Sequence, residues 1–340
     1  MSQFADLRRI VDAAGPFLTV TLPIPSDVDD AQHRFEVRWK NARREIESSR
    51  WDTDDIDDLD DVVMALPHDG GAGLVIVRAS DGTTLVEFLD EPVAEHVGED
   101  AAPRLAQVIE ARQRSIAHIV VETDRAGADL HAFDGGEILR TDEIEGDTEH
   151  IHRGHPGGWS QRRFQQRAEN TWERNADDVA EAIVELDRRV GAELVFVTGD
   201  VRARHLVHDA LPESVRSRTR LIDEGSADGI AEAVVRLLSD HVARRIRDLA
   251  GMLRDRLGTG TASTDADDIL DSFELGRVEH LLVHDDGNDD AVTDRDIGTI
   301  PAGTRVVDAA IAAALRSDAA ITVVPNLAVL DHPVAALYRW

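Results

Sequence analysis

The chain has 340 residues, enough for two or three domains with separate cores, and its hydrophobic share of 42% is that of a folded protein. It carries 37 basic and 67 acidic residues, a net charge of −30, so any contact with RNA must come from a local basic patch. It has no cysteine, which excludes disulfides, thiolate zinc sites and cysteine nucleophiles.

The first residues do not form a targeting signal. Residues 1–9 contain neither an apolar core nor a cleavage site, and no apolar run in the chain approaches the roughly 18 residues of a membrane helix. The sequence therefore predicts a soluble cytoplasmic protein with no membrane partner.

The first predicted domain covers residues 1–114 and mixes strands with helices. Its elements, in order, are a strand at 16–23, a helix at 30–49, strands at 73–79 and 83–89, and a helix at 101–114. Ser80-Asp81-Gly82 joins the two later strands as a hairpin turn. The glycines at 70, 71 and 73 precede a strand rather than follow one, so we interpret them as a turn and not as a phosphate loop.

An aspartate-rich run lies inside this domain. Seven aspartates occur within residues 52–61. The run lacks the loop glycine and the twelfth-position glutamate of an EF-hand, so it does not predict calcium binding. We interpret it as a solvated acidic surface.

The second predicted domain, residues 115–250, alternates strands and helices and therefore predicts a partly parallel sheet. Its elements are a strand at 116–122, hairpin strands at 129–133 and 137–144, a helix at 160–190, a strand at 194–198, a helix at 201–211, a strand at 220–223, and a helix from 227 to 249 or beyond.

The third predicted domain, residues 251–340, follows a Gly/Thr-rich linker at 258–264. Its elements are a helix at 265–275, a strand at 280–284, a helix at 306–316, a strand at 320–324 and a strand-like tail at 334–340. The predicted fold class is α/β, with three mixed α/β domains.

Residues 151–174 invert the charge of the chain. Five arginines stand against two glutamates, and 5 − 2 gives a local charge of +3. The segment contains Gly157-Gly158 and runs into an amphipathic helix. A basic, glycine-tipped projection on an acidic protein predicts contact with RNA.

The residues expected to contact RNA are Arg153, His155, Gly157, Gly158, Trp159, Arg162, Arg163, Arg167 and Arg174. Arg163, Arg167 and Arg174 share one helix face, which suits phosphate contacts. Trp159 suits stacking on a base, and the alternative is that it folds back onto its own domain. For Ser160 the structural alternative is an N-cap.

Two other chemistries are not supported in this segment. His150, His152 and His155 have the spacing of metal ligands, but no carboxylate stands at a matching position, so no metal site is predicted. Ser160 lies outside the Gly-x-Ser-x-Gly motif of a nucleophile elbow, so no serine hydrolase is predicted.

Residues 157–164, Gly-Gly-Trp-Ser-Gln-Arg-Arg-Phe, resemble the loop of the archaeal and eukaryotic class-1 release factor and Pelota family. In its release factors a Gly-Gly-Gln tip is followed by Ser-x-x-Arg-Phe at the start of a long helix. The bacterial branch, which includes the ribosome-hibernation factor Balon, is the best match. Residues 267–279 and 336–340 resemble the family's L7Ae-like C-terminal domain, whereas the first 115 residues match only in position.

The resemblance implies a middle domain like domain 2 of the release factors and a last domain of the L7Ae-like type. It implies a ribosome-binding translation factor in the A site, contacting rRNA. P-site tRNA and an elongation-factor GTPase are further candidate partners. It implies no cofactor, no metal and no DNA.

The departures from the family bear on function. Trp159 occupies the position of the glutamine that orients water, and an indole has one donor and no acceptor. The stop-codon motif Asn-Ile-Lys-Ser is absent, and the single lysine is Lys40. We therefore expect a hibernation or stress-protection factor without release chemistry, and not an enzyme. Two alternatives stay open: a peptidyl-tRNA hydrolase or rescue factor that uses Gln161, and a protein-interaction module that does not bind ribosomes.

Overall fold

The computed structural model describes residues 4–24, 31–48, 51, 53–65, 71–134, 137–145, 159–287, 291–324 and 332–340. By their internal contacts the residues divide into two compact units. One unit combines Met1–Gln113 with Arg244–Trp340, and the other is Arg114–Ala243. Each unit is described by itself.

The first sheet of the larger unit is antiparallel and has the strand order β3-β2-β1-β4. Its strands are β1 (Phe17–Pro23), β2 (Gly73–Ala79), β3 (Thr84–Leu89) and β4 (His96–Asp100). The predicted hairpin between β2 and β3 is confirmed, and Gly82 in its turn has φ +87°, a conformation that favours glycine.

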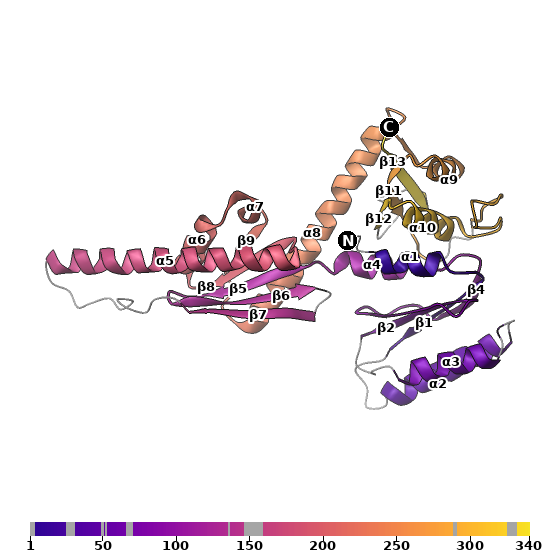
Figure 1. Cartoon of the computed structure of the whole chain (residues 1–340), viewed down its shortest axis with the longest axis horizontal. Coiled ribbons are helices and arrows are strands. Elements are labelled where there is room, and N and C mark those ends of the chain that lie inside the picture. Colours follow the sequence, from indigo (N-terminus) through magenta and orange to yellow (C-terminus); the bar gives the residue numbers. More distant parts are fainter. Residues whose placement is uncertain are drawn as a thin grey trace. The chain divides into compact units, whose positions relative to one another are not determined.

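Helices cover both faces of this sheet, as Figure 1 shows. On one face lie α2 (Ala31–Glu47) and α3 (Thr53–Met64), and on the other lie α1 (Ala5–Val11) and α4 (Ala106–Arg114). The predicted strand at 16–23 and the helix at 30–49 are confirmed with small changes of bounds. The prediction omitted α1, α3 and β4, and it began α4 five residues too early.

The second sheet of the larger unit has the order β10-β13-β11-β12, with only the β11–β12 pair parallel. Its strands are β10 (Ala262–Ser263), β11 (Val278–Val283), β12 (Ala320–Val323) and β13 (Val334–Tyr338). Two helices accompany it, α9 (Ala266–Glu274) and the largely buried α10 (Val306–Arg316). The helices and strands expected here are confirmed, and β10 adds a short strand inside the predicted linker.

One apolar core joins the two ends of the chain inside this unit. It contains Leu7 and Ile109 together with Ile269 and Ile311, all buried. The side chain of Gln113 adds a polar link: its Nε2 donates to the Val323 carbonyl at 2.6 Å, and its Oε1 accepts from the Val323 amide at 2.9 Å. The buried Gln113 amide thus pairs with β12 as a neighbouring strand would.

The smaller unit has a mixed sheet of order β7-β6-β5-β8-β9, in which β5, β8 and β9 are parallel. Its strands are β5 (His118–Thr123), β6 (Gly127–Asp134), β7 (Glu137–Glu145), β8 (Leu194–Gly199) and β9 (Thr219–Leu221). The partly parallel sheet expected from the alternation of elements is confirmed.

Helices α5 (Trp159–Val190) and α6 (Val201–Ala210) pack on one face of this sheet (Figure 1). A short α7 (Glu213–Arg216) precedes β9, and α8 (Ala227–Leu257) covers the other face with Ala233 and Val234. Since α8 continues past Ala243, its last turns belong to the larger unit.

The described residues therefore form three sheets with accompanying helices, and the predicted mixed α/β fold class is confirmed. The finer division into domains 1–114, 115–250 and 251–340 stays a prediction.

Candidate functional site

The long helix predicted after Gly157-Gly158 begins at Trp159 and extends to Val190. Its start follows the two glycines directly in sequence, as the family register requires. Gln161 accordingly belongs to the first turn of the helix. This backbone position weighs against the alternative in which Gln161 takes the place of the release glutamine.

Most of the predicted RNA-contacting residues lie where side chains are not described. Arg153, His155, Gly157 and Gly158 are outside the described residues, as are His150 and His152. The backbone of α5 includes Trp159, Arg162, Arg163 and Arg167, but their side chains are not among those described. Arg174 is described, and its side chain is exposed. The RNA contact therefore stays a prediction.

The rest of α5 is anchored by an apolar stripe at helical spacing. Trp172, Ala176, Val179, Ile183 and Leu186 are all buried, and the last four belong to a core shared with β5, β6 and β8. The periodicity of the sequence predicts an apolar stripe of Phe164, Ala168, Trp172, Val179, Ile183, Leu186 and Val190, and four of its members, Trp172, Val179, Ile183 and Leu186, are buried in the structure. The base of the helix is therefore firmly packed on the sheet.

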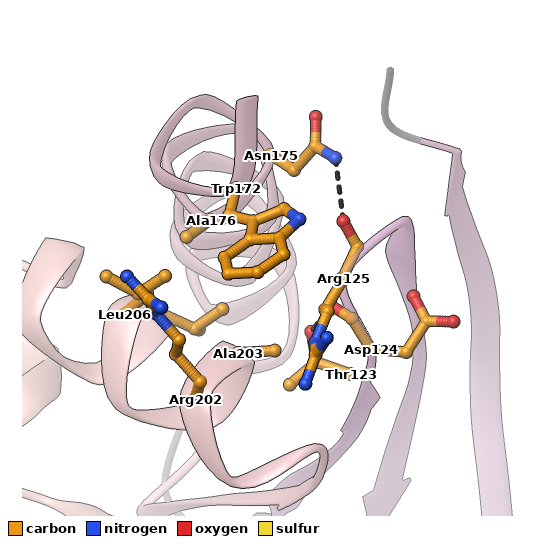
Figure 2. Close-up of a pocket in the computed structure, with 10 residues that line it drawn as sticks. Thr123, Asp124, Arg125, Trp172, Asn175, Ala176, Arg202, Ala203 and Leu206 are labelled. Atoms are coloured by element: carbon orange, nitrogen blue, oxygen red, sulfur yellow. Dashed lines mark hydrogen bonds between the residues drawn. The ribbon is translucent and has the colours of Figure 1, made fainter. Parts of the chain in front are cut away.

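A small pocket surrounds Trp172, and we call it the Trp172 pocket. It lies where β5 and β8 end, between α5 and the first turns of α6 (Figure 2). It is lined by Thr123, Asp124, Arg125, Trp172, Asn175, Ala176, Arg202, Ala203, Leu206 and Val207. The sheet thus offers the carboxyl ends of two neighbouring parallel strands, the usual place of ligand sites in α/β folds.

Two arginines lie over the indole of Trp172. The guanidinium carbons of Arg125 and Arg202 are 4.8 Å and 4.7 Å from the ring centroid, within the range of cation–π attraction. Figure 2 shows the ring between the two side chains. Asn175 adds a hydrogen bond from its Nδ2 to the Arg125 carbonyl at 2.9 Å, which joins α5 to the β5–β6 turn.

Asp200 places both arginines. It is the N-cap of α6, and its Oδ1 accepts hydrogen bonds from the amides of Arg202 and Ala203. Its Oδ2 pairs with Arg125 at 3.0 Å. Burial acts to raise the pKa of Asp200, but the hydrogen bonds from Ala203 and Arg125 outweigh it, so the pKa is lowered and the carboxylate stays charged.

A close backbone approach supports the floor of the pocket. Gly199 has φ +106°, and a Cβ there would lie 2.0 Å from the carbonyl oxygen of Thr123. Only glycine fits this position without moving the end of β5. The sequence interpretation missed this site, although a signal was present: Asp124-Arg125 and Asp200-Val201-Arg202 each come after the end of a predicted strand, with one residue in between.

Several basic residues of α2 are engaged in contacts within their own unit. Arg43 pairs with Glu47 and Asp57, both at 2.9 Å, and Arg38 donates to the Pro23 carbonyl at 2.8 Å. The buried Arg78 likewise pairs with Asp55 and Asp58. Part of the aspartate run in α3 therefore neutralises arginines of the same unit.

No group of three or more potential metal-ligating side chains occurs in the described part of the chain. Among the helices of these same residues, none combines the length and the apolar character that a bilayer crossing requires.

The smaller unit thus combines a mixed five-stranded sheet with a 32-residue helix that directly follows a Gly-Gly pair in the sequence. Residues 117–259 match the family described as Bacterial archaeo-eukaryotic release factor family 2. The resemblance expected from the sequence is thus confirmed over residues 117–259, where the chain is similar to the bacterial branch of the archaeal and eukaryotic release factor family.

A curated relative covers more of the chain. The protein named "Uncharacterized protein Rv2629" of Mycobacterium tuberculosis (strain ATCC 25618 / H37Rv) is 27% identical over 298 residues, which are 84% of this chain and 79% of the relative. The match extends well beyond the middle domain.

Three solved structures are also similar to this chain. The archaeal translation termination factor aRF1 is 16% identical with a TM-score of 0.26, covering 100% of this chain and 99% of that one. A ribosome-bound archaeal Pelota, in a model with ABCE1, is 15% identical with a TM-score of 0.44, covering 99% and 93%. Archaeoglobus fulgidus Pelota is 12% identical with a TM-score of 0.39, covering 99% and 91%.

Proposed function

We propose that the protein is a ribosome-binding hibernation or stress-protection factor that occupies the A site and does not release peptides. The observation that carries the proposal is the start of α5 at Trp159. The helix begins where the family's long helix begins, while the residue at the tip position cannot orient water as glutamine does. In this proposal the protein retains the long helix of the release factors but has Trp159 in place of their catalytic glutamine.

In this proposal the RNA contacts come from the basic segment 151–174 and not from the rest of the surface. A net charge of −30 repels a polyanion, so a +3 segment must supply the attraction locally. Arg174 is the one arginine of that segment whose side chain is described, and it is exposed. An elongation-factor GTPase is the candidate delivery partner.

The first experiment is co-sedimentation with 70S ribosomes over a range of salt concentrations. Binding should weaken steeply with salt, because arginine–phosphate contacts release counterions. Replacing Arg163, Arg167 and Arg174 with alanine should weaken binding. It should also flatten the plot of log affinity against log salt concentration, because up to about three phosphate contacts are lost.

A matched control removes the same charge from other places in the same unit. Arg188 and Arg189 are exposed and Arg216 is partly exposed, and each pairs locally with Glu185 or Glu213. Their triple alanine variant should keep wild-type binding. Equal loss of binding in both triple variants would show that net charge alone matters and would refute the proposed interface.

The second experiment separates hibernation from rescue. Incubating the protein with ribosomes that carry peptidyl-tRNA should free no peptide above background, at stop or sense codons. Release that disappears in Gln161→Ala would replace the hibernation role by the rescue-enzyme alternative. Absence of ribosome binding at every salt concentration would favour the protein-interaction alternative.

A further inference from the structure

Asp308 is a carboxylate buried in the first turn of α10, inside the larger unit. Its side chain is 1% exposed. Its Oδ2 accepts a hydrogen bond from Nη1 of Arg305 at 3.0 Å, whereas its Oδ1 has no hydrogen-bond partner among the described residues. A buried polar atom without a partner is rare in folded proteins, and it costs most when the group carries a charge.

Arg305 is shared by two carboxylates, and Asp308 is the less well satisfied of the two. Asp285, which follows β11, accepts from Nη2 of Arg305 at 2.8 Å and also from the amide of Gly287 at 3.0 Å. Its side chain is 11% exposed, so water reaches Asp285 more readily than it reaches Asp308. A proton taken up by this pair of carboxylates therefore binds to Asp308 in preference.

The other titratable and charged groups that face Asp308 come from β4 and from the residues before α4. Arg104 pairs with Asp100 at 2.8 Å, and the two act on Asp308 with opposite signs. Burial, together with the positive charges of Arg104 and Arg305, lowers the pKa of His96 on β4. The His96 ring is therefore neutral at neutral pH and adds no positive charge.

The charges of this group of residues, which we call the Asp308 cluster, do not balance. Its charged members are Arg104, Arg305, Asp100, Asp285 and Asp308. Two positive charges against three negative ones leave 2 − 3, or −1, and a proton on Asp308 brings the sum to zero. Burial raises the pKa of Asp308 to about 7, against the attraction of Arg305 and with the help of repulsion from Asp285.

We propose that the Asp308 cluster is a pH-dependent joint between α10 and the end of β4. With a proton on Asp308 the cluster is neutral, and the two segments stay closed. When the proton leaves, a buried charge remains with one oxygen unpartnered, and local opening that admits water becomes more frequent. This joint lies within the larger unit and does not depend on ribosome binding.

A permanent ion pair that only anchors α10 is the alternative. The first turn of a helix favours a negative charge, and Arg305 would keep Asp308 ionised. Such an anchor would not account for the unpartnered Oδ1, because a carboxylate held there permanently would be expected to accept hydrogen bonds at both oxygens. The two roles differ in whether stability changes with pH.

The direction of the pH dependence follows from burial of the neutral acid. The pKa of Asp308 is raised from its ordinary value of 3.8 to about 7, so its contribution to stability is fully present below about pH 4 and is lost as the pH rises toward 7. Between pH 5 and pH 8 the unfolding equilibrium constant of the wild type should rise about 100-fold relative to that of a variant without this carboxyl group.

Urea unfolding of the full chain at pH 5, 6, 7 and 8 tests the titration. Asp308→Asn has the shape of the neutral acid and does not ionise, so the wild type should show the 100-fold relative loss against it. Asp318→Asn is the matched control, because Asp318 is exposed and pairs with Arg8 at 3.1 Å. Its pH dependence should follow the wild type. Parallel pH dependence of wild type and Asp308→Asn overturns the proposal.

Hydrogen exchange tests whether the titration opens the joint. Protection, corrected for the intrinsic exchange rate at each pH, should fall between pH 6 and pH 8 for the amides of β4 and of the first turn of α10. In Asp308→Asn it should stay constant, and the amides of β5 in the smaller unit are the internal control. Equal protection at both pH values in the wild type would show that the segments do not move, which overturns the joint.

A second variant carries the test if Asp308→Asn does not fold. Asp285→Asn removes the carboxylate that competes for Arg305 and repels Asp308, so Asp308 should ionise more easily. The loss of stability of this variant between pH 5 and pH 8 should then be smaller than that of the wild type. An unchanged loss would contradict the role of the Asp308 cluster.

Discussion

In the proposed function Trp159 is the tip residue, and two roles are predicted for its indole. If it stacks on a base, Trp159→Ala should lower ribosome affinity roughly 5- to 150-fold, since such a contact contributes about 1–3 kcal/mol. The melting temperature should stay unchanged, and Trp159→Gln should fold equally well. Ribosome affinity and thermal melting measure the two effects separately.

If Trp159 instead packs into its own domain, the two substitutions should lower the stability of the protein. A side chain packed into its own domain would cost about 3–5 kcal/mol of stability on truncation, as core aromatics do. A marked drop in melting temperature for both Trp159→Ala and Trp159→Gln would therefore contradict the stacking role.

His280 gives the larger unit a defined pH dependence. Burial on β11 lowers the pKa of His280 to about 4, and the ring hydrogen-bonds the Thr322 hydroxyl at 2.8 Å. The unfolded chain takes up this proton near pH 6.5, so the contribution of His280 is fully present above pH 6.5 and is lost as the pH falls toward 4. By pH 5 the loss should reach about 2 kcal/mol.

Urea unfolding at pH 7.5 and pH 5 measures this loss. His280→Gln does not titrate and should lose about 2 kcal/mol less than the wild type between the two values. His205→Gln, at an exposed position of α6, should follow the wild type. Identical pH dependence in wild type and His280→Gln would show that another group is responsible.

At the level of elements, the ends of β5 and β8 depend on one glycine. Gly199→Ala would place a Cβ 2.0 Å from the Thr123 carbonyl oxygen at φ +106°, so either backbone must move. We expect the smaller unit to lose about 2 kcal/mol or more of stability. Chemical denaturation followed by circular dichroism measures the loss.

Gly225→Ala is the matched control in the same unit. A Cβ at Gly225 would meet no atom within 4 Å, and its φ is not positive, so stability should change by less than about 1 kcal/mol. Similar losses in both variants would mean that the close approach of the two strands is not what requires glycine.

At the scale of the whole molecule, residues from both ends of the chain share one core, and Gln113 is the most specific link. Gln113→Met keeps the size of the side chain but removes both hydrogen bonds to Val323. Since two buried backbone groups then lack a partner, we expect a loss of about 2–4 kcal/mol in the stability of the larger unit.

Gln32→Met is the control for this substitution, because Gln32 is exposed and its Nε2 donates to the Glu36 carboxylate on the surface of α2 at 3.1 Å. Its stability should match the wild type in urea unfolding. A wild-type midpoint for Gln113→Met would show that the link to β12 contributes nothing to stability.

Local patterns predicted much of the fold. The helix that became α5 was predicted within one residue at its start, because an apolar stripe and a Gly-Gly boundary act over a few residues. Helix α3 was missed because the aspartate run hid its stripe of Ile56, Leu59 and Val63, which is buried against the sheet. The aspartates of this segment suggested a solvated acidic surface, although its apolar residues are spaced as in an amphipathic helix.

The sequence by itself determined most of the elements and the long helix after Gly157-Gly158, since each depends on neighbours along the chain. Only the tertiary structure decided what surrounds Trp172, what Gln113 binds and which arginines the aspartates neutralise. Arg125, Trp172 and Arg202 are far apart in sequence and meet only because β5, α5 and α6 converge at one edge of the sheet. The hydrophobic periodicity of a sequence predicts which face of a helix or strand a residue occupies, but the residues that it contacts depend on how the elements pack together.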